Sequence, residues 1–81
     1  MSTPVTVYTK PRCVQCDATK RHLDKRGTEY VPVDITQDLA ALEHVRSLGY
    51  LQVPVVIAGD NHWSGYVPDK LNALTTTNQE N

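Results

Sequence analysis

Two cysteines, the only ones in the chain, lie three residues apart in the segment Cys13-Val14-Gln15-Cys16. A disulfide between them closes a ring of four residues, which is worth about 2 kcal/mol in loop entropy and joins no distant elements. Such a bridge is a poor structural staple. A single close pair of cysteines is more typical of redox or metal chemistry, so the spacing favours a reactive site over a framework.

The residues on either side of the pair predict a strand followed by a helix. Val5–Thr9 is rich in β-branched and aromatic residues and lies between Pro4 and Pro11, which is typical of a strand. Helix formers dominate residues 14–26, and Gly27 can end that helix as a left-handed cap. Cys13 is therefore expected at the start of a helix, at an exposed junction between loop and helix.

That position has a chemical consequence for Cys13. The first backbone N–H groups of a helix have no partner within it, and together with the positive end of the helix dipole they favour a thiolate. A stabilisation of up to about 2 kcal/mol corresponds to a fall in the pKa of Cys13 on the order of one unit. Lys10 and Arg12 add positive charge nearby. We expect Cys13 to attack a partner's disulfide, and the more buried Cys16 to resolve the mixed disulfide.

Metal binding is the main alternative chemistry for the pair. A zinc site takes four ligands, but the sequence has no second cysteine pair, and His22, His44 and His62 lack the spacing of zinc-binding histidines. We expect these histidines at the surface. A carrier that holds a metal or an iron–sulfur cluster between two subunits through Cys13, with Cys16 as a bystander, stays as a further hypothesis.

The middle of the chain predicts an edge strand and an amphipathic helix. Residues 29–35 are typical of a strand, and Pro32 confines that strand to a sheet edge because it cannot donate a ladder hydrogen bond. Gly49 ends the helical pattern that follows. The apolar residues of that pattern recur every three positions and are Leu39, Leu42, Val45 and Leu48.

The last third predicts a hairpin and a short helix. Residues 53–58 and 62–66 flank the turn-forming trio Gly59-Asp60-Asn61, and the first arm is apolar throughout, as expected of a central strand. Pro68 suits the first position of a helix that continues to about residue 74. Residues 75–81 form a polar tail that we expect to fray.

The order β-α-β-α-β-β-α predicts an α/β fold with a four-stranded mixed sheet and helices on both faces. The first two strands are joined through a helix and therefore run parallel, with the hairpin on the other side of the first strand. A chain of 81 residues makes one domain, residues 1–81, and leaves no room for a second.

Composition argues against several classes of function. Eight Lys and Arg against nine Asp and Glu give a net charge of −1, without the basic excess of a nucleic-acid-binding protein. The longest apolar stretch, residues 53–58, is far shorter than the roughly 20 residues of a membrane helix. No apolar signal segment follows Met1, so we expect a cytoplasmic protein.

Three motifs occur in order along the chain. They are Cys13-Val14-Gln15-Cys16 preceded by Lys10-Pro11, Gln52-Val53-Pro54-Val55-Val56, and Trp63-Ser64-Gly65-Tyr66 followed by Pro68-Asp69. With the order of elements, they resemble the NrdH-redoxin family, on the glutaredoxin-like branch of the thioredoxin superfamily. The resemblance covers about residues 4–74 and implies a thioredoxin-like fold of the compact glutaredoxin type.

The resemblance also implies roles for residues outside the cysteine pair. On sequence alone the Val53–Pro54 bond is expected to be trans, because only about 5–6% of X–Pro bonds in folded proteins are cis. The family pattern implies a cis bond beside the cysteines, with the backbone of Val53 docking an extended partner segment by strand-like hydrogen bonds. Ser64 belongs to the same motif, and Gly65 allows close approach. Trp63 either contacts the active end or packs in the hairpin and anchors the last helix.

Members of this family take electrons from thioredoxin reductase, and ultimately from NADPH, and pass them to class Ib ribonucleotide reductase. The resemblance therefore implies a monomeric dithiol electron carrier with no bound cofactor. Lys10 fits this function and equally a glutathione-dependent glutaredoxin, which is the alternative. The glycine pair that admits the carboxylate of glutathione appears here as Ser64-Gly65, which argues against that alternative. Tyr66 and Val67 stand where the family commonly has phenylalanine and arginine, so this chain lacks that arginine's charge.

Two further sets of charged residues have expected roles. Asp60 and His62 are the titratable hairpin residues available to deprotonate Cys16, and neither is favoured over the other. The basic residues late in the first helix are expected to form a solvated face rather than a partner site; they are Lys20, Arg21, Lys25 and Arg26.

Overall fold

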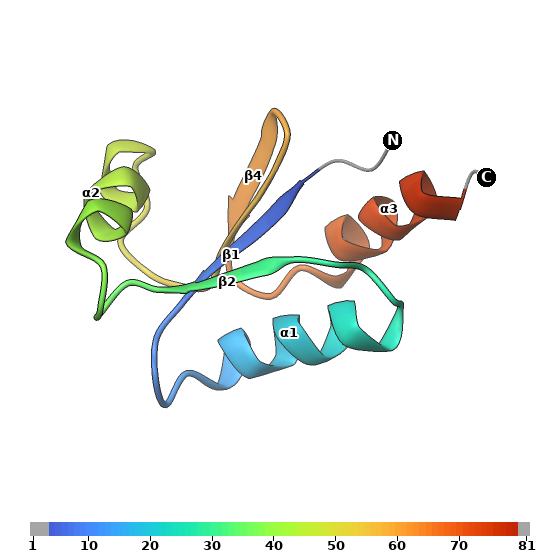
Figure 1. The fold of residues 1–81 in the computed structure, drawn as a ribbon, viewed down its shortest axis with the longest axis horizontal. Coiled ribbons are helices and arrows are strands. Elements are labelled where there is room, and N and C mark those ends of the chain that lie inside the picture. The colour runs from blue at the N-terminus through green and yellow to red at the C-terminus, as the bar shows by residue number, and fades with distance from the viewer. Residues whose placement is uncertain (1–3, 80–81) are drawn as a thin grey trace.

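The computed structural model describes residues 4–79 and confirms the expected α/β fold (Figure 1). The elements of the described chain are β1 (Val5–Thr9), α1 (Val14–Lys25), β2 (Val31–Asp34), α2 (Leu39–Ser47), β3 (Val55–Ala58), β4 (Asn61–Ser64) and α3 (Pro68–Gln79). α1 and α3 share one face of the sheet, and α2 covers the other.

The sheet has the strand order β2-β1-β3-β4, with β1 and β2 parallel and the other neighbours antiparallel. β2 is an edge strand, as Pro32 predicts, and the apolar strand β3 is central. In the register, Val7 of β1 lies between Pro32 on one side and Val56 on the other. Val7 and Val56 are both fully buried, so the middle of the sheet is also the middle of the core.

Both β2 and β3 are shorter than the sequence predicts. The strand expected over residues 29–35 is only Val31–Asp34, because it pairs with just the four residues from Thr6 to Thr9 of its parallel neighbour. The strand expected from residue 53 begins at Val55. Pro54 precedes it and has no N–H to donate to the ladder, which accounts for the later start.

The hairpin turn is tighter than predicted. Ala58 pairs directly with Asn61, so the turn contains two residues, Gly59 and Asp60, rather than three. The second arm consequently begins one residue early and ends at Ser64, two residues before the expected end. Residues 65–67 are thereby released from the sheet and connect β4 to α3.

The last helix is longer than the sequence predicts. α3 continues to Gln79, whereas the residues after 74 were expected to fray. A helix that has already formed gains a hydrogen bond for each residue added, so even a polar extension can remain helical. Residues 80–81 of the expected tail lie outside the described residues.

The first helix ends as expected, and the second differs in one side chain. Gly27 has a φ of 72°, and the amide of Thr28 donates to the carbonyl of Leu23 at 3.0 Å, which closes the cap beyond α1. In α2, Ala41 and Val45 are buried, but Leu39 is 69% exposed. Positions 39 and 41 lie on nearly opposite sides of a helix, so burying Ala41 leaves Leu39 in solvent.

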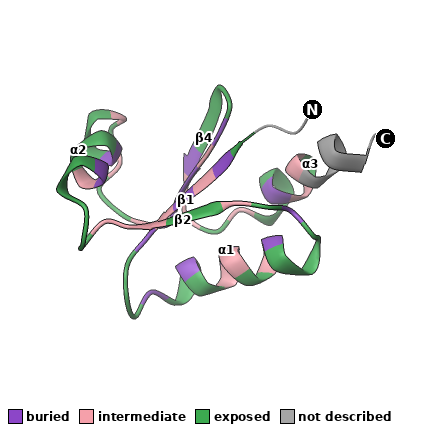
Figure 2. Cartoon of the chain, in the orientation of Figure 1, coloured by how far each residue is buried: buried purple, intermediate pink, exposed green. Residues whose placement is uncertain are grey.

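The core lies between the sheet and the pair α1 and α3. Leu23 of α1 and Leu71 of α3 are fully buried, and they join Val7 and Val56 of the sheet in one cluster. Figure 2 shows buried residues on α1 and α3 and along the strands, with exposed residues covering the outer surfaces. Burying a leucine side chain contributes about 1.5–3 kcal/mol, so a domain of this size depends on few such residues.

We expect Leu71→Ala to lower the free energy of unfolding by about 2–5 kcal/mol, because it removes a fully buried side chain and leaves a cavity. Urea denaturation followed by circular dichroism measures this change. The matched control is Leu39→Ala, which removes an exposed leucine and should change stability by less than about 0.5 kcal/mol. Equal effects of the two substitutions would contradict this assignment of the core.

Candidate active site

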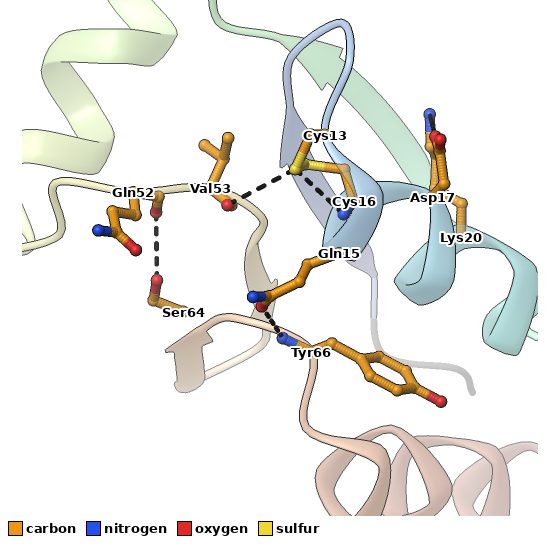
Figure 3. Close-up of a disulfide and its surroundings, with 9 residues drawn as sticks. All are labelled: Cys13, Gln15, Cys16, Asp17, Lys20, Gln52, Val53, Ser64 and Tyr66. Carbon is orange, nitrogen blue, oxygen red and sulfur yellow. Dashed lines mark hydrogen bonds and ion pairs between the residues drawn. A yellow bond between two sulfur atoms is a disulfide. The ribbon is translucent and has the colours of Figure 1, made fainter.

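Cys13 and Cys16 form a disulfide at the start of α1, with their Cα atoms 5.1 Å apart. Cys13 is the residue immediately before the helix, and its extended backbone (φ −117°, ψ 107°) is that of an N-cap. Its sulfur accepts a hydrogen bond from the backbone amide of Cys16 at 3.1 Å (Figure 3). The expected position of the pair, at the point where coil becomes helix, is confirmed.

Burial of the two cysteines differs in degree. Cys16 is fully buried, as expected, but Cys13 is only 9% exposed, so the expectation of an exposed junction was wrong. The cause is a segment distant in sequence: the backbone carbonyl of Val53 lies 3.7 Å from the sulfur of Cys13 and covers it (Figure 3). Of the two cysteines, only Cys13 lines the groove described below.

The two backbone groups beside Cys13 favour different forms of its sulfur. An N–H group that points at sulfur favours the thiolate, because the charged form is the better acceptor. A carbonyl oxygen beside the same sulfur favours the thiol, which can donate a hydrogen bond to it. The amide of Cys16 and the carbonyl of Val53 therefore act in opposite directions once the disulfide is reduced.

A groove of about 360 Å³ opens beside Cys13. One wall comes from the start of α1, and the other comes from residues 51–53. Val14 and Leu51 are 82% and 88% exposed, so the groove has an apolar side chain on each wall. The residues that line it are Lys10, Cys13, Val14, Gln15, Ile35, Leu51, Gln52 and Val53.

Gln15 connects the cysteine motif to the segment after β4, a role that the sequence did not reveal. Its side-chain Oε1 accepts a hydrogen bond from the backbone amide of Tyr66 at 3.2 Å (Figure 3). Within the same segment, Gly65 donates its amide to the carbonyl of Pro54 at 2.7 Å, and the hydroxyl of Ser64 donates to the carbonyl of Gln52 at 3.1 Å. Residues 64–66 thus hold the cysteine helix and the segment before β3 together.

The structure places the other residues singled out by the sequence as follows. The Val53–Pro54 bond is cis, as the family resemblance implies and against the expectation from the sequence alone. Pro54 is itself buried, and Trp63 is 7% exposed within the core cluster, which fits packing in the hairpin. The ammonium group of Lys70, in α3, lies 5.6 Å from the centre of the Trp63 ring. Lys10 is exposed and lines the groove.

The titratable residues of the hairpin do not gather at the cysteines. Asp60 lies in the turn next to Ala58, which pairs with Val5, at the end of the sheet opposite Thr9 and the cysteine loop. His62 and His44 are exposed and His22 is half-buried, in line with their expected place at the surface. Among the described residues, no group of three or more His, Cys, Asp or Glu side chains is arranged to hold a metal ion.

The pKa of Asp34 is shifted by hydrogen bonds within its own turn and not by a contact with the cysteines. Its carboxylate accepts hydrogen bonds from the hydroxyl of Thr36 at 2.6 Å and from the amide of Thr36 at 2.8 Å, and these bonds lower its pKa below the usual value. The charged carboxylate holds the turn that follows β2 and contains Ile35, a residue of the groove. Burial, with Asp24 nearby, raises the pKa of Tyr30.

Comparisons with known proteins agree with this geometry. The glutaredoxin family profile matches residues 5–63. The chain is 46% identical over 70 residues to the glutaredoxin-like protein NrdH of Escherichia coli K12, covering 86% of each chain, and 31% identical over 70 residues to the Lactococcus lactis protein of that name, covering 86% and 97%.

Solved structures give the same result. The NrdH-redoxin structure from Escherichia coli superposes with a TM-score of 0.85 at 45% identity, over 88% of this chain and 93% of that one. A buckwheat glutaredoxin solved as its glutathione complex superposes with a TM-score of 0.73 at 25% identity, over 91% and 77%. None of the helices in residues 4–79 combines the length and the hydropathy of a membrane-spanning segment.

The four-stranded fold and the disulfide that begins its first helix define a redox protein of the glutaredoxin class, with the thioredoxin fold. Within that class, the chain belongs to the NrdH-redoxin family.

We expect Gly65→Ala to destabilise the protein by about 1–2 kcal/mol, because Gly65 has a φ of 92°, which is unfavourable for any residue with a Cβ atom. An added Cβ would lie 3.5 Å from Oε1 of Gln15, an ordinary contact, so the cost should come from the backbone. Chemical denaturation of Gly65→Ala in the wild-type and Gln15→Ala backgrounds separates the two causes. A cost that disappears in the Gln15→Ala background would show that the side-chain contact was responsible.

Proposed function

We propose that this protein is a dithiol electron carrier that reduces disulfides in other proteins. The observation that carries the proposal is the asymmetry of the pair: Cys16 is fully buried, whereas Cys13 lines the groove and takes a hydrogen bond from the first turn of α1. A partner's sulfur can therefore approach Cys13 but not Cys16. Because N–H donation favours a thiolate, Cys13 is also suited to be the attacking residue.

The reaction runs in two exchanges. The thiolate of Cys13 attacks one sulfur of the client disulfide, a bond forms between them, and the other client sulfur leaves as a thiolate. Cys16, after losing its proton, then attacks the sulfur of Cys13. The bond between Cys13 and the client breaks, and the client sulfur that was bonded to Cys13 leaves as a thiolate. Two electrons have moved to the client, and the protein is left with the Cys13–Cys16 disulfide seen in the structure.

The wall of the groove formed by residues 51–53 suits an extended client segment. Within the described chain, none of their backbone amides donates a hydrogen bond, so these groups are available to a partner. The exposed side chains of Val14 and Leu51 offer apolar contact on either side of Cys13, and Lys10 adds a positive charge. We infer that the client binds along Val53 by strand-like hydrogen bonds, as the family resemblance implies.

We further propose that thioredoxin reductase regenerates the dithiol with electrons from NADPH, and that class Ib ribonucleotide reductase is the client. The support is the 46% identity to a NrdH protein and the similarity to an NrdH-redoxin whose structure is described as explaining a thioredoxin-like activity profile. The exposed Lys10 in the groove would also suit glutathione, so the source of electrons requires a direct test.

A side-by-side assay identifies the reductant. We expect NADPH and thioredoxin reductase to sustain reduction of a protein disulfide such as insulin by this protein, and NADPH, glutathione and glutathione reductase to sustain it at least about tenfold more slowly. Consumption of NADPH measures both rates. Comparable turnover with glutathione and no response to thioredoxin reductase would instead make the protein a glutathione-dependent glutaredoxin.

Substituting each cysteine in turn should block the exchange at a different step. Cys13→Ser is expected to abolish transfer because it removes the only sulfur that the client can reach. Cys16→Ser should retain the first exchange and accumulate a mixed disulfide between Cys13 and the client, because the resolving thiol is missing. Non-reducing electrophoresis and mass spectrometry detect the adduct. Adducts that form with Cys13→Ser rather than Cys16→Ser would reverse the assigned roles.

A further inference from the structure

The wall of the groove at residues 51–53 is held in place mostly from its two ends. On one side, the amide of Tyr50 donates to the carbonyl of Val45 at 3.3 Å, and on the other the carbonyl of Pro54 accepts from Gly65 at 2.7 Å. Between these points the described backbone amides make no hydrogen bond. This short segment nevertheless supplies three of the groove residues and the carbonyl that lies 3.7 Å from the sulfur of Cys13.

Two side-chain contacts attach this segment to β4. The hydroxyl of Ser64 donates to the carbonyl of Gln52 at 3.1 Å (Figure 3). At the near end of the segment, the hydroxyl of Tyr50 lies 2.7 Å from Nδ1 of His62 and 3.3 Å from the carbonyl of His62. Both partners belong to β4, the edge strand on this side of the sheet.

The pairing of Tyr50 with His62 has a defined geometry. The two rings meet edge to face, with centroids 5.5 Å apart and planes at 79°. Tyr50 directly precedes Leu51, which is 88% exposed and has no buried contact of its own to fix the wall. The side chain of Tyr50 therefore attaches the wall to β4 on the N-terminal side of Leu51, as Ser64 does at Gln52 on its C-terminal side.

We propose that the hydrogen bond between Tyr50 and His62 is a positioning contact for the disulfide exchange proposed above, on which this inference rests. It holds residues 51–53 at the distance from Cys13 that an extended client segment needs. Neither side chain lines the groove or touches the sulfur, so the contact acts on client binding rather than on the reactivity of Cys13.

The test measures binding and reactivity separately, with the full chain reduced beforehand by dithiothreitol and then freed of it. Reduced protein is mixed with increasing insulin, and formation of the Cys13–Cys16 disulfide gives a half-saturating concentration and a maximal rate. The second-order rate with bis(2-hydroxyethyl) disulfide, which is too small to span the groove, reports the reactivity of Cys13 alone. Thermal unfolding checks that each variant is folded.

Tyr50→Phe removes only the hydroxyl, and His62→Ala removes its imidazole partner while leaving the backbone carbonyl at that position. Both should raise the half-saturating insulin concentration about three- to fivefold, as expected for losing one exposed hydrogen bond, and leave the maximal rate and the rate with the small disulfide unchanged. His62→Asn keeps an amide group, which can donate or accept, close to the place of Nδ1 and should restore most of the binding. The matched control is Tyr8→Phe, because Tyr8 meets His44 through its ring, at a centroid distance of 6.0 Å, and the substitution keeps that ring.

Three results would overturn the inference: an unchanged half-saturating concentration in Tyr50→Phe, an equal loss of rate with the small disulfide, or a defect in His62→Asn as large as in His62→Ala. The wild-type arm, which uses no reductase, tests the proposed function on its own. Wild-type protein that reduces insulin, with variants that match it, refutes the positioning role alone; wild-type protein that leaves insulin intact refutes both.

Discussion

The sulfur of Cys13 occupies the place where most helices carry a side-chain oxygen, accepting a hydrogen bond from the amide of Cys16 in the first turn. This one contact both caps the helix and favours the reactive form of the sulfur, because the N–H group that bonds to the sulfur also stabilises negative charge on it. The reactive group is thereby part of the secondary structure. A change in the charge or bonding of that sulfur therefore alters the hydrogen bond that caps α1.

The site is completed by segments that are distant along the chain. The cysteine motif, the residues before β3 and the residues after β4 meet at one end of the sheet, and hydrogen bonds from backbone and side-chain groups hold them together. The segment after β4 contacts both of the others, Gln15 on one side and Pro54 on the other. Because it leaves the sheet at Ser64, its backbone groups are free to make these contacts.

Burial distinguishes the two sulfur atoms. A protein of this size has a small core, and both cysteines are buried, but Cys16 is buried completely whereas Cys13, 9% exposed, lines the groove. Desolvation disfavours a thiolate at Cys16, whereas the helix start favours one at Cys13. The carbonyl of Val53 moderates that preference by favouring the thiol. We therefore expect the reactivity of the pair to depend on three features: the burial of Cys16, the helix start at Cys13 and the carbonyl of Val53.

Local preferences in the chain suffice to predict the order of the elements, the place of Cys13 at a helix start, and the position of β2 at the edge, because strand propensity, caps and the missing N–H of Pro32 act locally. The cis bond before Pro54 followed from the family pattern and not from local preference. The contacts of Val53 with Cys13, of Gln15 with Tyr66 across 51 residues, and of Tyr50 with His62 become visible only in the folded chain. Contacts of that kind depend on how the sheet brings remote segments together, and strand pairing also shortened the strands that local propensity had extended.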